Sequence, residues 1–203
     1  METTKGKYIR VIFGCFCITW WLAIATYWLF MGVPVHLLWL CDLGFLLTGI
    51  GFLLRSSVLL TSQFIGGFLV QLIWSLDFLP RLLFGMKIFG WTGYMFSPTH
   101  SAIAKFLSLF HLFLPVLLLY GVIKYGYAKK GLRLQVILTV PLYILSYLLT
   151  NSADNTNWVL GPFWKIQNVL PPLLYLAVWM MLTFLMYVVF DFVSRRFYFK
   201  NNH

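Results

Sequence analysis

Six apolar stretches, separated by short polar turns and two longer loops, divide the sequence. A helix needs about 20 mainly apolar residues to cross the hydrocarbon layer of a membrane. The pattern therefore predicts an all-α fold, a polytopic membrane protein with a bundle of six transmembrane helices and residues 1–203 as a single domain. The predicted helices cover residues 10–31, 36–54, 57–79, 103–125, 134–150 and 169–193.

The first apolar stretch follows Lys5, Lys7 and Arg10, which is also the arrangement at the start of a signal peptide. Its apolar run continues to Val33, whereas the apolar part of a signal peptide has only about 7–15 residues. We therefore interpret this stretch as a retained transmembrane helix.

Basic residues are distributed unevenly between the two ends of the predicted bundle. Eleven of the fifteen lie on the end that carries both termini, and positively charged loops stay in the cytoplasm. The chain is therefore predicted to lie in a bacterial inner membrane with its N- and C-termini in the cytoplasm. The eleven residues are Lys5, Lys7, Arg10, Arg55, Lys124, Lys129, Lys130, Arg133, Arg195, Arg196 and Lys200.

Composition supports the membrane assignment and limits the partners. Hydrophobic residues make up 61% of the chain and charged residues 10%, with a mean hydropathy of +0.86. Soluble proteins carry about 25% charged residues. The net charge of +10 lies mostly beside apolar segments, so we expect contact with membrane lipid and no nucleic-acid partner. Cys15, Cys17 and Cys41 form no CxxC motif, and we expect no metal site and no cofactor.

His111 is the strongest candidate functional residue. It lies inside the fourth predicted helix, four residues before Pro115. Proline has no N–H and clashes with the carbonyl four residues earlier, so the His111 carbonyl loses its helical partner. An ionisable ring inside a membrane usually faces a cavity, a partner or the bundle interior.

Other polar residues gather in the same outer half of the predicted bundle, and we expect them to form an outer-leaflet-facing pocket. In the third helix Gln63, Gly67, Trp74 and Asp77 fall within an arc of about 60°. We assign Asp77 with His111 as candidate catalytic residues. The candidate binding residues are His100, Asp42, Asn151, Asn157 and Trp158.

Three hypotheses for the role of His111 are compatible with the sequence. As a general base oriented by Asp77 or Asp42, it would activate a hydroxyl or thiol for acyl transfer. A zinc site would need ligands from other helices, because His100 lies about 16 Å away along a helix and no HxxxH motif exists. In the structural reading, His111 hydrogen-bonds across helices to Asn157 or to a freed carbonyl. Candidate hydroxyls are those of Thr48, Thr61, Ser75, Ser108 and Thr99.

The two long loops, residues 80–102 and 151–168, differ in character. The first is glycine-rich and aromatic, so it is expected to lie at the membrane interface, with Trp91, Tyr94 and Phe96 at the level of the lipid headgroups. The second is dense in asparagine and other turn-forming residues. It predicts either tight ordered turns or a lid over the pocket.

Two resemblances to known families bear on function. SLFHLFLPVLLLYGVIKYGYAKKGLRLQ (108–135) and SYLLTNSADNTNWVLGP (146–162), with WSLDFLPRLLFG and GWTGYMF, resemble an uncharacterised family of bacterial membrane-associated proteins. That resemblance implies a fold and a location but no reaction. The chain is also distantly similar to the androgen-induced membrane hydrolases, which have six spans and a membrane histidine shortly before a proline. His111, Pro115 and Trp158-Val159 would match, but the family's threonine nucleophile has no matching position.

These observations favour an integral membrane protein whose polar pocket binds a lipid or small ligand. A lipid-directed hydrolase or acyltransferase using His111 is the second hypothesis. A small-solute transporter is the third, and the absence of a visible internal repeat makes it less attractive. The sequence does not indicate an oligomeric state.

Overall fold

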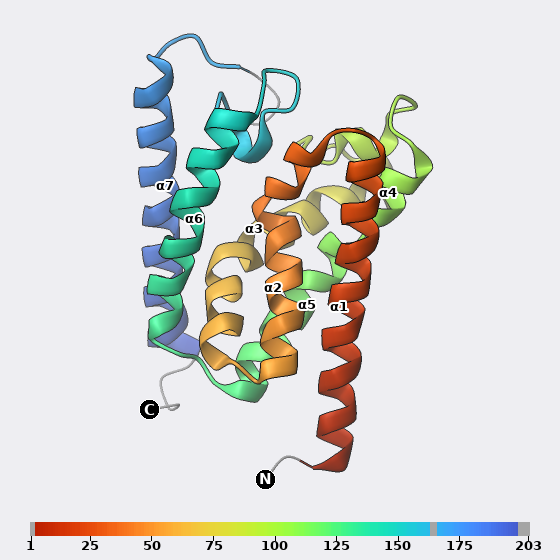
Figure 1. Cartoon of the computed structure of the whole chain (residues 1–203), viewed down its shortest axis with the longest axis vertical. Coiled ribbons are helices and arrows are strands. Elements are labelled where there is room, and N and C mark those ends of the chain that lie inside the picture. The colour runs from red at the N-terminus through yellow and green to blue at the C-terminus, as the bar shows by residue number, and fades with distance from the viewer. Residues whose placement is uncertain (1–2, 163–165, 199–203) are drawn as a thin grey trace.

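The computed structural model describes residues 3–162 and 166–198, and it confirms the predicted all-α helical bundle. Seven α-helices and four shorter helical turns follow one another, and the described part of the chain contains no strand (Figure 1). The α-helices are α1 (Thr4–Phe30), α2 (Leu40–Leu54), α3 (Ser57–Phe84), α4 (Ala102–Ser108), α5 (Phe110–Tyr125), α6 (Lys130–Leu149) and α7 (Pro172–Val193). The turns are η1 (Pro34–Leu38), η2 (Gly93–Phe96), η3 (Thr156–Trp158) and η4 (Ser194–Tyr198).

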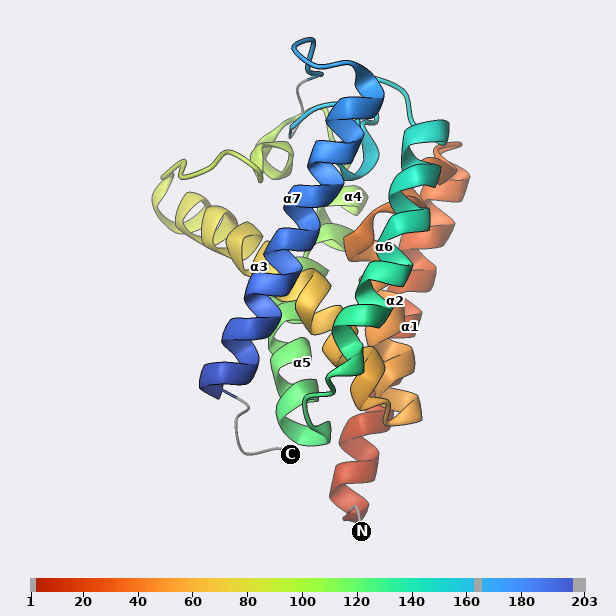
Figure 2. The same ribbon diagram turned by 90° about the vertical axis from the view of Figure 1, so that its left-hand side faces the viewer.

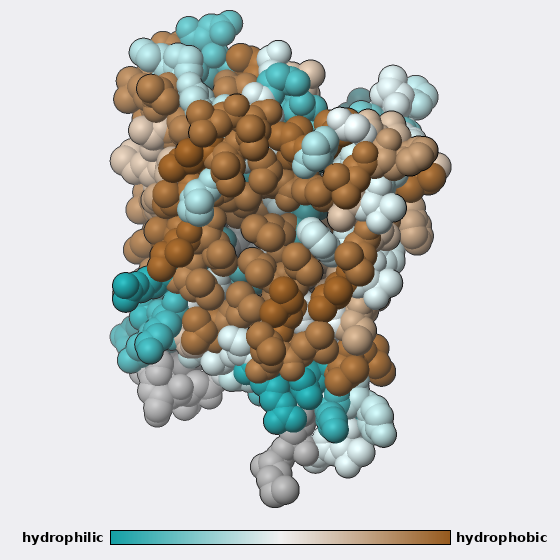
Figure 3. All heavy atoms as spheres, in the orientation of Figure 1, coloured by the Kyte–Doolittle hydropathy of each residue, from teal (hydrophilic) through white to brown (hydrophobic). Residues whose placement is uncertain are grey.

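Five helical segments of the described chain are long and apolar enough to cross a membrane. They are Thr4–Phe30, Ser57–Phe84, Ala102–Tyr125, Lys130–Leu149 and Pro172–Phe197. The surface agrees, because hydrophobic residues cover the middle of the visible face and hydrophilic residues gather at both of its ends (Figure 3). The protein is therefore a multi-pass membrane protein.

Helix α2 is shorter than the sequence predicted. We expected a span over 36–54, but the 3₁₀ turn η1 takes up Pro34–Leu38 and α2 begins only at Leu40. Its 15 residues reach about 22 Å, less than the hydrocarbon thickness of about 30 Å. Helix α2 thus begins inside the bundle. There, Asn157 Nδ2 donates to the Leu38 carbonyl, and the Leu40 amide donates to Asn157 Oδ1.

The two ends of the bundle differ. One end, called here the terminal end, carries both termini and the turns after α2 and α5 (Figure 1). The opposite end, called the loop end, carries residues 31–39, 85–101, 150–162 and 166–171. Helix α3 runs obliquely through the molecule and packs against α2, α5, α6 and α7, so it contributes to every side of the interior (Figure 2).

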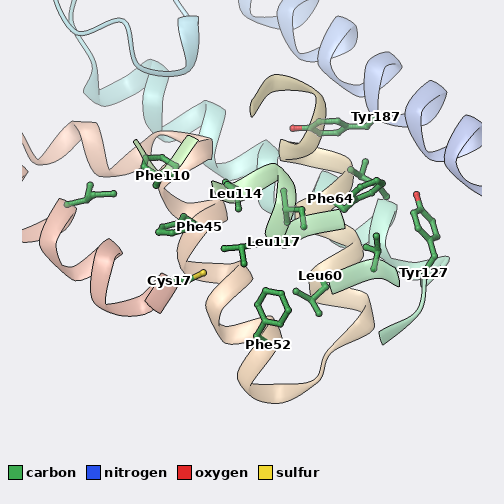
Figure 4. Close-up of a cluster of buried hydrophobic side chains, with 14 of the residues drawn as sticks. Cys17, Phe45, Phe52, Leu60, Phe64, Phe110, Leu114, Leu117, Tyr127 and Tyr187 are labelled. Carbon is green, nitrogen blue, oxygen red and sulfur yellow. The ribbon is translucent and has the colours of Figure 1, made fainter. Parts of the chain in front are cut away.

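A compact apolar core packs the helices against one another (Figure 4). Phe45 of α2 stacks on Phe110 of α5 with ring centroids 5.0 Å apart, and Leu60 of α3 and Leu114 of α5 are buried in the same core. Helices α1 and α2 approach closely at Gly49, where an added Cβ would lie 2.8 Å from Cys17 Cβ. Several core residues, among them Phe110, Leu114 and Leu118 of α5, also line the cavity described next.

Candidate functional site

A cavity of about 670 Å³ occupies the middle of the bundle and reaches toward the loop end. It is lined by residues of all seven α-helices and of the three loop-end connections. Much of its wall is apolar, but an unusual number of polar side chains for a membrane interior reach it. The histidine, aspartate and amide side chains among them are His36, Asp42, Gln63, Gln71, His100, His111, Gln135, Asp154 and Asn157.

Asp42 contributes the deepest acidic group of the cavity. It lies in the first turn of α2 and is only 6% exposed. Among the described residues its carboxylate has one hydrogen-bond partner, the Cys41 thiol at 3.9 Å. Asp42 is placed there because α2 begins inside the bundle. A buried carboxylate with so weak a donor is costly to hold without a further partner.

His111 reaches the cavity from α5. Its Nδ1 lies 2.5 Å from Oε1 of Gln71 on α3, and its ring packs on Trp74 at 4.7 Å between centroids. Within the described chain no residue is hydrogen-bonded to Nε2. The contact with Gln71 Oε1 makes Nδ1 the protonated nitrogen of a neutral ring, which leaves Nε2 as an acceptor at the cavity wall.

The carbonyl of His111 finds a partner on the neighbouring helix. Pro115 removes the N–H that this carbonyl would bind within α5, as the sequence indicated. The Ser75 hydroxyl of α3 lies 3.2 Å from the backbone carbonyl oxygen of His111 and 2.9 Å from the backbone carbonyl oxygen of Gln71. One hydroxyl proton is thus shared between the two carbonyls, and this contact joins α3 to α5 beside the cavity.

A chain of hydrogen bonds forms the floor of the cavity. Gln135 of α6 accepts from Ser62 Oγ at 2.8 Å and donates to Thr139 Oγ1 at 3.2 Å, which lies 3.3 Å from the Tyr187 hydroxyl of α7. The Gln135 amide can lie there because Gly66 has no side chain; a Cβ at that position would be 2.1 Å from Gln135 Nε2. The three helices α3, α6 and α7 are therefore joined by polar contacts at mid-depth.

Aromatic rings dominate the part of the wall nearest the loop end. Six of the nine tryptophans line the cavity, and Trp158 contacts three of them, with centroids 6.4 Å from Trp39, 5.4 Å from Trp91 and 6.1 Å from Trp179. Trp28 and Trp74 are the remaining two. The cavity is thus rich in π-electron surface that can bind a cation.

Tyr94, from the loop before α4, also lines the cavity. Burial raises the pKa of its phenol, whereas hydrogen bonds with Ser108 and Trp74 partly oppose this effect. The Tyr94 oxygen accepts from Trp74 Nε1 at 3.2 Å. This contact places a phenol and an indole side by side in the cavity wall.

At the loop end, His36 of η1 meets Asp154 of the α6–α7 connection. His36 Nε2 lies 3.2 Å from Asp154 Oδ1, and the His36 ring packs on Trp28 at 4.2 Å. Burial lowers the pKa of His36, and the Asp154 carboxylate partly opposes this effect. The pair ties two loops together over the cavity.

Asp77, assigned with His111 from the sequence, does not line this cavity. It is fully buried and accepts four hydrogen bonds, from the amides of Phe89 at 2.7 Å, Gly90 at 3.0 Å and Thr92 at 2.8 Å and from the Thr92 hydroxyl at 2.8 Å. Its carboxylate therefore anchors the loop after α3. Because the donors lie 12–15 residues downstream in an irregular segment, helical spacing alone could not identify them.

The other predicted binding residues separate into two groups. Asp42, His100, Asn157 and Trp158 line the cavity. Asn151 does not, since its side chain accepts from the amides two and three residues later, at 2.8 and 3.1 Å, in a surface turn. Asn157 also donates to Ser146 Oγ at 2.8 Å, so it joins α6 to the start of α2 rather than contacting His111.

Sequence reasoning missed Gln71, Gln135, Cys41, Tyr143 and Thr183 as cavity residues. Gln71 carried a usable signal: it lies four residues after Gly67 and three before Trp74, close to the polar arc of the third helix. The other four residues reach the cavity because of which helices pack together, and residue spacing within one helix does not predict that packing.

Among the described residues, no hydroxyl or thiol is hydrogen-bonded to the His111 ring. The described hydroxyls of Thr48, Ser75 and Ser108 donate to carbonyls of their own helices, at 2.6, 2.9 and 2.9 Å. Thr61 accepts from the Ala128 amide, and Thr99 contacts His100. The hydrolase hypothesis thus stays a prediction without a nucleophile placed beside the imidazole. The described residues also contain no group of three His, Cys, Asp or Glu side chains that could hold a metal ion.

Comparison with known proteins adds no family. No family, characterised protein or solved structure matches the chain. The two resemblances noted in the sequence therefore stay predictions, and function has to be argued from the cavity itself.

Proposed function

We propose that this protein binds a lipid or another amphipathic small molecule in the central cavity. The observation that carries the proposal is the cavity itself, about 670 Å³ of space with converging polar groups inside a membrane-embedded bundle. Sites for small molecules in proteins typically measure about 300–1,000 Å³ and combine apolar walls with a few placed polar groups.

Two features of the wall support a ligand rather than a packing defect. Asp42 and Nε2 of His111 have strong hydrogen-bonding capacity that the described protein groups leave unused. Buried polar groups are normally hydrogen-bonded, so groups of this kind at a cavity wall indicate a partner that occupies the space. The apolar remainder of the wall suits an alkyl or acyl chain.

The proposal is tested by binding measurements on the whole protein in neutral maltoside micelles. The probes are six-carbon amphiphiles with a trimethylammonium, a hydroxyl or a sulfate headgroup, and the signal is tryptophan fluorescence. We expect saturable binding of at least one probe, because six tryptophans line the cavity.

Two substitutions of matched size separate cavity binding from binding to the outer surface. Gly67 lines the cavity, and a Cβ there meets only Leu118 Cδ1 at 3.5 Å, so Gly67→Leu places its side chain in open space. Ala177 is exposed on α7 outside the cavity lining. Gly67→Leu should weaken binding about tenfold or more, and Ala177→Leu less than about twofold. Equal binding by both variants, or no saturable binding of any probe, would refute the proposal.

We also propose that the terminal end faces the cytoplasm of a bacterial inner membrane. The basic residues of the sequence concentrate at that end, and positive loops are retained in the cytoplasm. A membrane-impermeant maleimide applied to intact cells should label a cysteine at exposed Ser152 and not one at exposed Lys129. The reverse labelling would overturn the orientation.

A further inference from the structure

The charge of the cavity wall is opposite to that of the chain. The protein has 15 Lys and Arg residues and a net charge of +10, yet among the described residues no lysine or arginine lines the cavity. Two carboxylates, Asp42 and Asp154, do. These carboxylates would therefore repel an anionic headgroup, and no lysine or arginine of the lining would compensate. They would attract a cationic headgroup.

The two carboxylates differ in how far the protein satisfies them. Asp154 lies at the loop end and contacts His36 at 3.2 Å. Asp42 is 6% exposed and has only the Cys41 thiol, a weak donor. A desolvated carboxylate is stable as an ion only when an opposite charge or several hydrogen bonds compensate its burial. The cavity beside Asp42 therefore fits a positive group.

The rings around this part of the cavity have the matching chemistry. Trp74 and Tyr94, which are joined by a hydrogen bond, line the same cavity as Asp42, and so do Trp39, Trp91 and Trp158. Tryptophan is the aromatic residue that attracts cations most strongly, and desolvation increases that attraction. Quaternary ammonium groups are bound in this way in aromatic sites.

We infer that the ligand of the cavity carries an ammonium group, held by the Asp42 carboxylate and the surrounding aromatic rings, with its apolar chain in the rest of the cavity. This inference rests on the proposed binding function and adds the chemical class of the ligand. A metal ion does not fit the same place, because the described residues offer no group of three ionisable ligands. The ammonium group can belong to a soluble organic cation or to a lipid headgroup.

The test compares headgroups on one chain length. The protein in maltoside micelles is titrated with hexyltrimethylammonium, hexanol and hexyl sulfate, and the dissociation constant of each is measured by tryptophan fluorescence. We expect hexyltrimethylammonium to bind about tenfold more tightly than hexanol, and hexyl sulfate to bind most weakly. Lysophosphatidylcholine and lysophosphatidylglycerol form a second pair that tests whether a lipid headgroup supplies the cation.

Asp42→Asn keeps the size of the side chain and removes its charge. It should weaken hexyltrimethylammonium binding about tenfold and change hexanol binding less than about twofold. The variant should fold, because it replaces a buried charge by a neutral amide, and thermal unfolding checks this. If Asp42→Asn fails to fold, Asp154→Asn provides a second carboxylate variant. We expect it to weaken cation binding less than Asp42→Asn would.

The outcomes distinguish the two proposals. Equal dissociation constants for hexanol and hexyltrimethylammonium, with both unchanged in Asp42→Asn, would overturn the ammonium inference. The proposed binding function would not be affected by that result. Stronger binding of hexyl sulfate would overturn it as well. Failure of every probe to bind saturably would refute the proposed function, and the ammonium inference with it.

Discussion

Replacing Asp77 by alanine tests whether this residue supports the structure or takes part in the chemistry of the site. The carboxylate is fully buried and accepts four hydrogen bonds from the loop after α3. The amides of Phe89 and Gly90 belong to exposed residues and regain water when the carboxylate is removed. Thr92 is fully buried, so its two hydrogen bonds dominate the cost.

The expected loss follows from those two bonds. A hydrogen bond to a charged group contributes about 1.5–3 kcal/mol, so Asp77→Ala should lower the free energy of unfolding by about 3–6 kcal/mol. Asp77→Asn keeps one acceptor oxygen and should lose about half as much. The assay is dodecyl sulfate titration in maltoside micelles, with hydrogen exchange of residues 86–92 as a local measurement.

Ligand binding separates the structural role from a role in the site. Asp77 does not line the cavity, so any effect of Asp77→Asn on hexyltrimethylammonium binding acts through the anchored loop that carries Trp91 and should accompany a loss of stability. An unfolding free energy within about 0.5 kcal/mol of the parent for Asp77→Ala would contradict the anchoring role. Unchanged stability combined with a tenfold loss of binding would restore Asp77 to the site.

Two further perturbations test the packing and the loop end. An added Cβ at Gly49 would lie 2.8 Å from Cys17 Cβ, so Gly49→Ala should lower the free energy of unfolding by about 1–3 kcal/mol, whereas Gly67→Ala, which meets only ordinary contacts, should change it by less than about 0.5 kcal/mol. Equal effects of the two would refute the close α1–α2 approach. Burial lowers the pKa of His36 from its ordinary 6.5, so the unfolded chain binds this proton more readily. The stability contributed by neutral His36 is thus complete above pH 6.5 and is lost as the pH falls through the lowered pKa. His36→Asn should reduce the loss of stability between pH 7.5 and 5.5, and an unchanged pH profile would contradict this assignment.

The helices could be predicted from the sequence because each one is indicated by a long run of apolar residues within its own segment. Long apolar runs predicted the all-α bundle, and the Pro115 rule identified the freed carbonyl that Ser75 approaches. The start of α2 was not predictable in the same way. It depends on Asn157, whose side chain binds Leu38 and Leu40 from nearly 120 positions away, so no pattern near residue 40 encodes it.

The candidate site was predictable in its polar residues but not in their partners. Histidine and aspartate inside apolar segments stand out in a sequence, so Asp42 and His111 could be singled out. Their surroundings depend on which helices become neighbours. Gln71 meets His111 across the α3–α5 contact, and the floor around Gln135 needs α3, α6 and α7 together. Long-range packing of this kind leaves no periodic signal in one chain.

The central claim is that the cavity holds a ligand, and a crystal structure with a heavy-atom probe tests it most directly. The protein is crystallised from a lipidic phase with hexyltrimethylammonium that carries a terminal bromine, and the bromine is located by anomalous scattering. We expect a bromine peak inside the cavity and ammonium density beside Asp42, with both lost in Gly67→Leu. Bromine peaks confined to the outer surface of the bundle, with the cavity unchanged, would contradict the account.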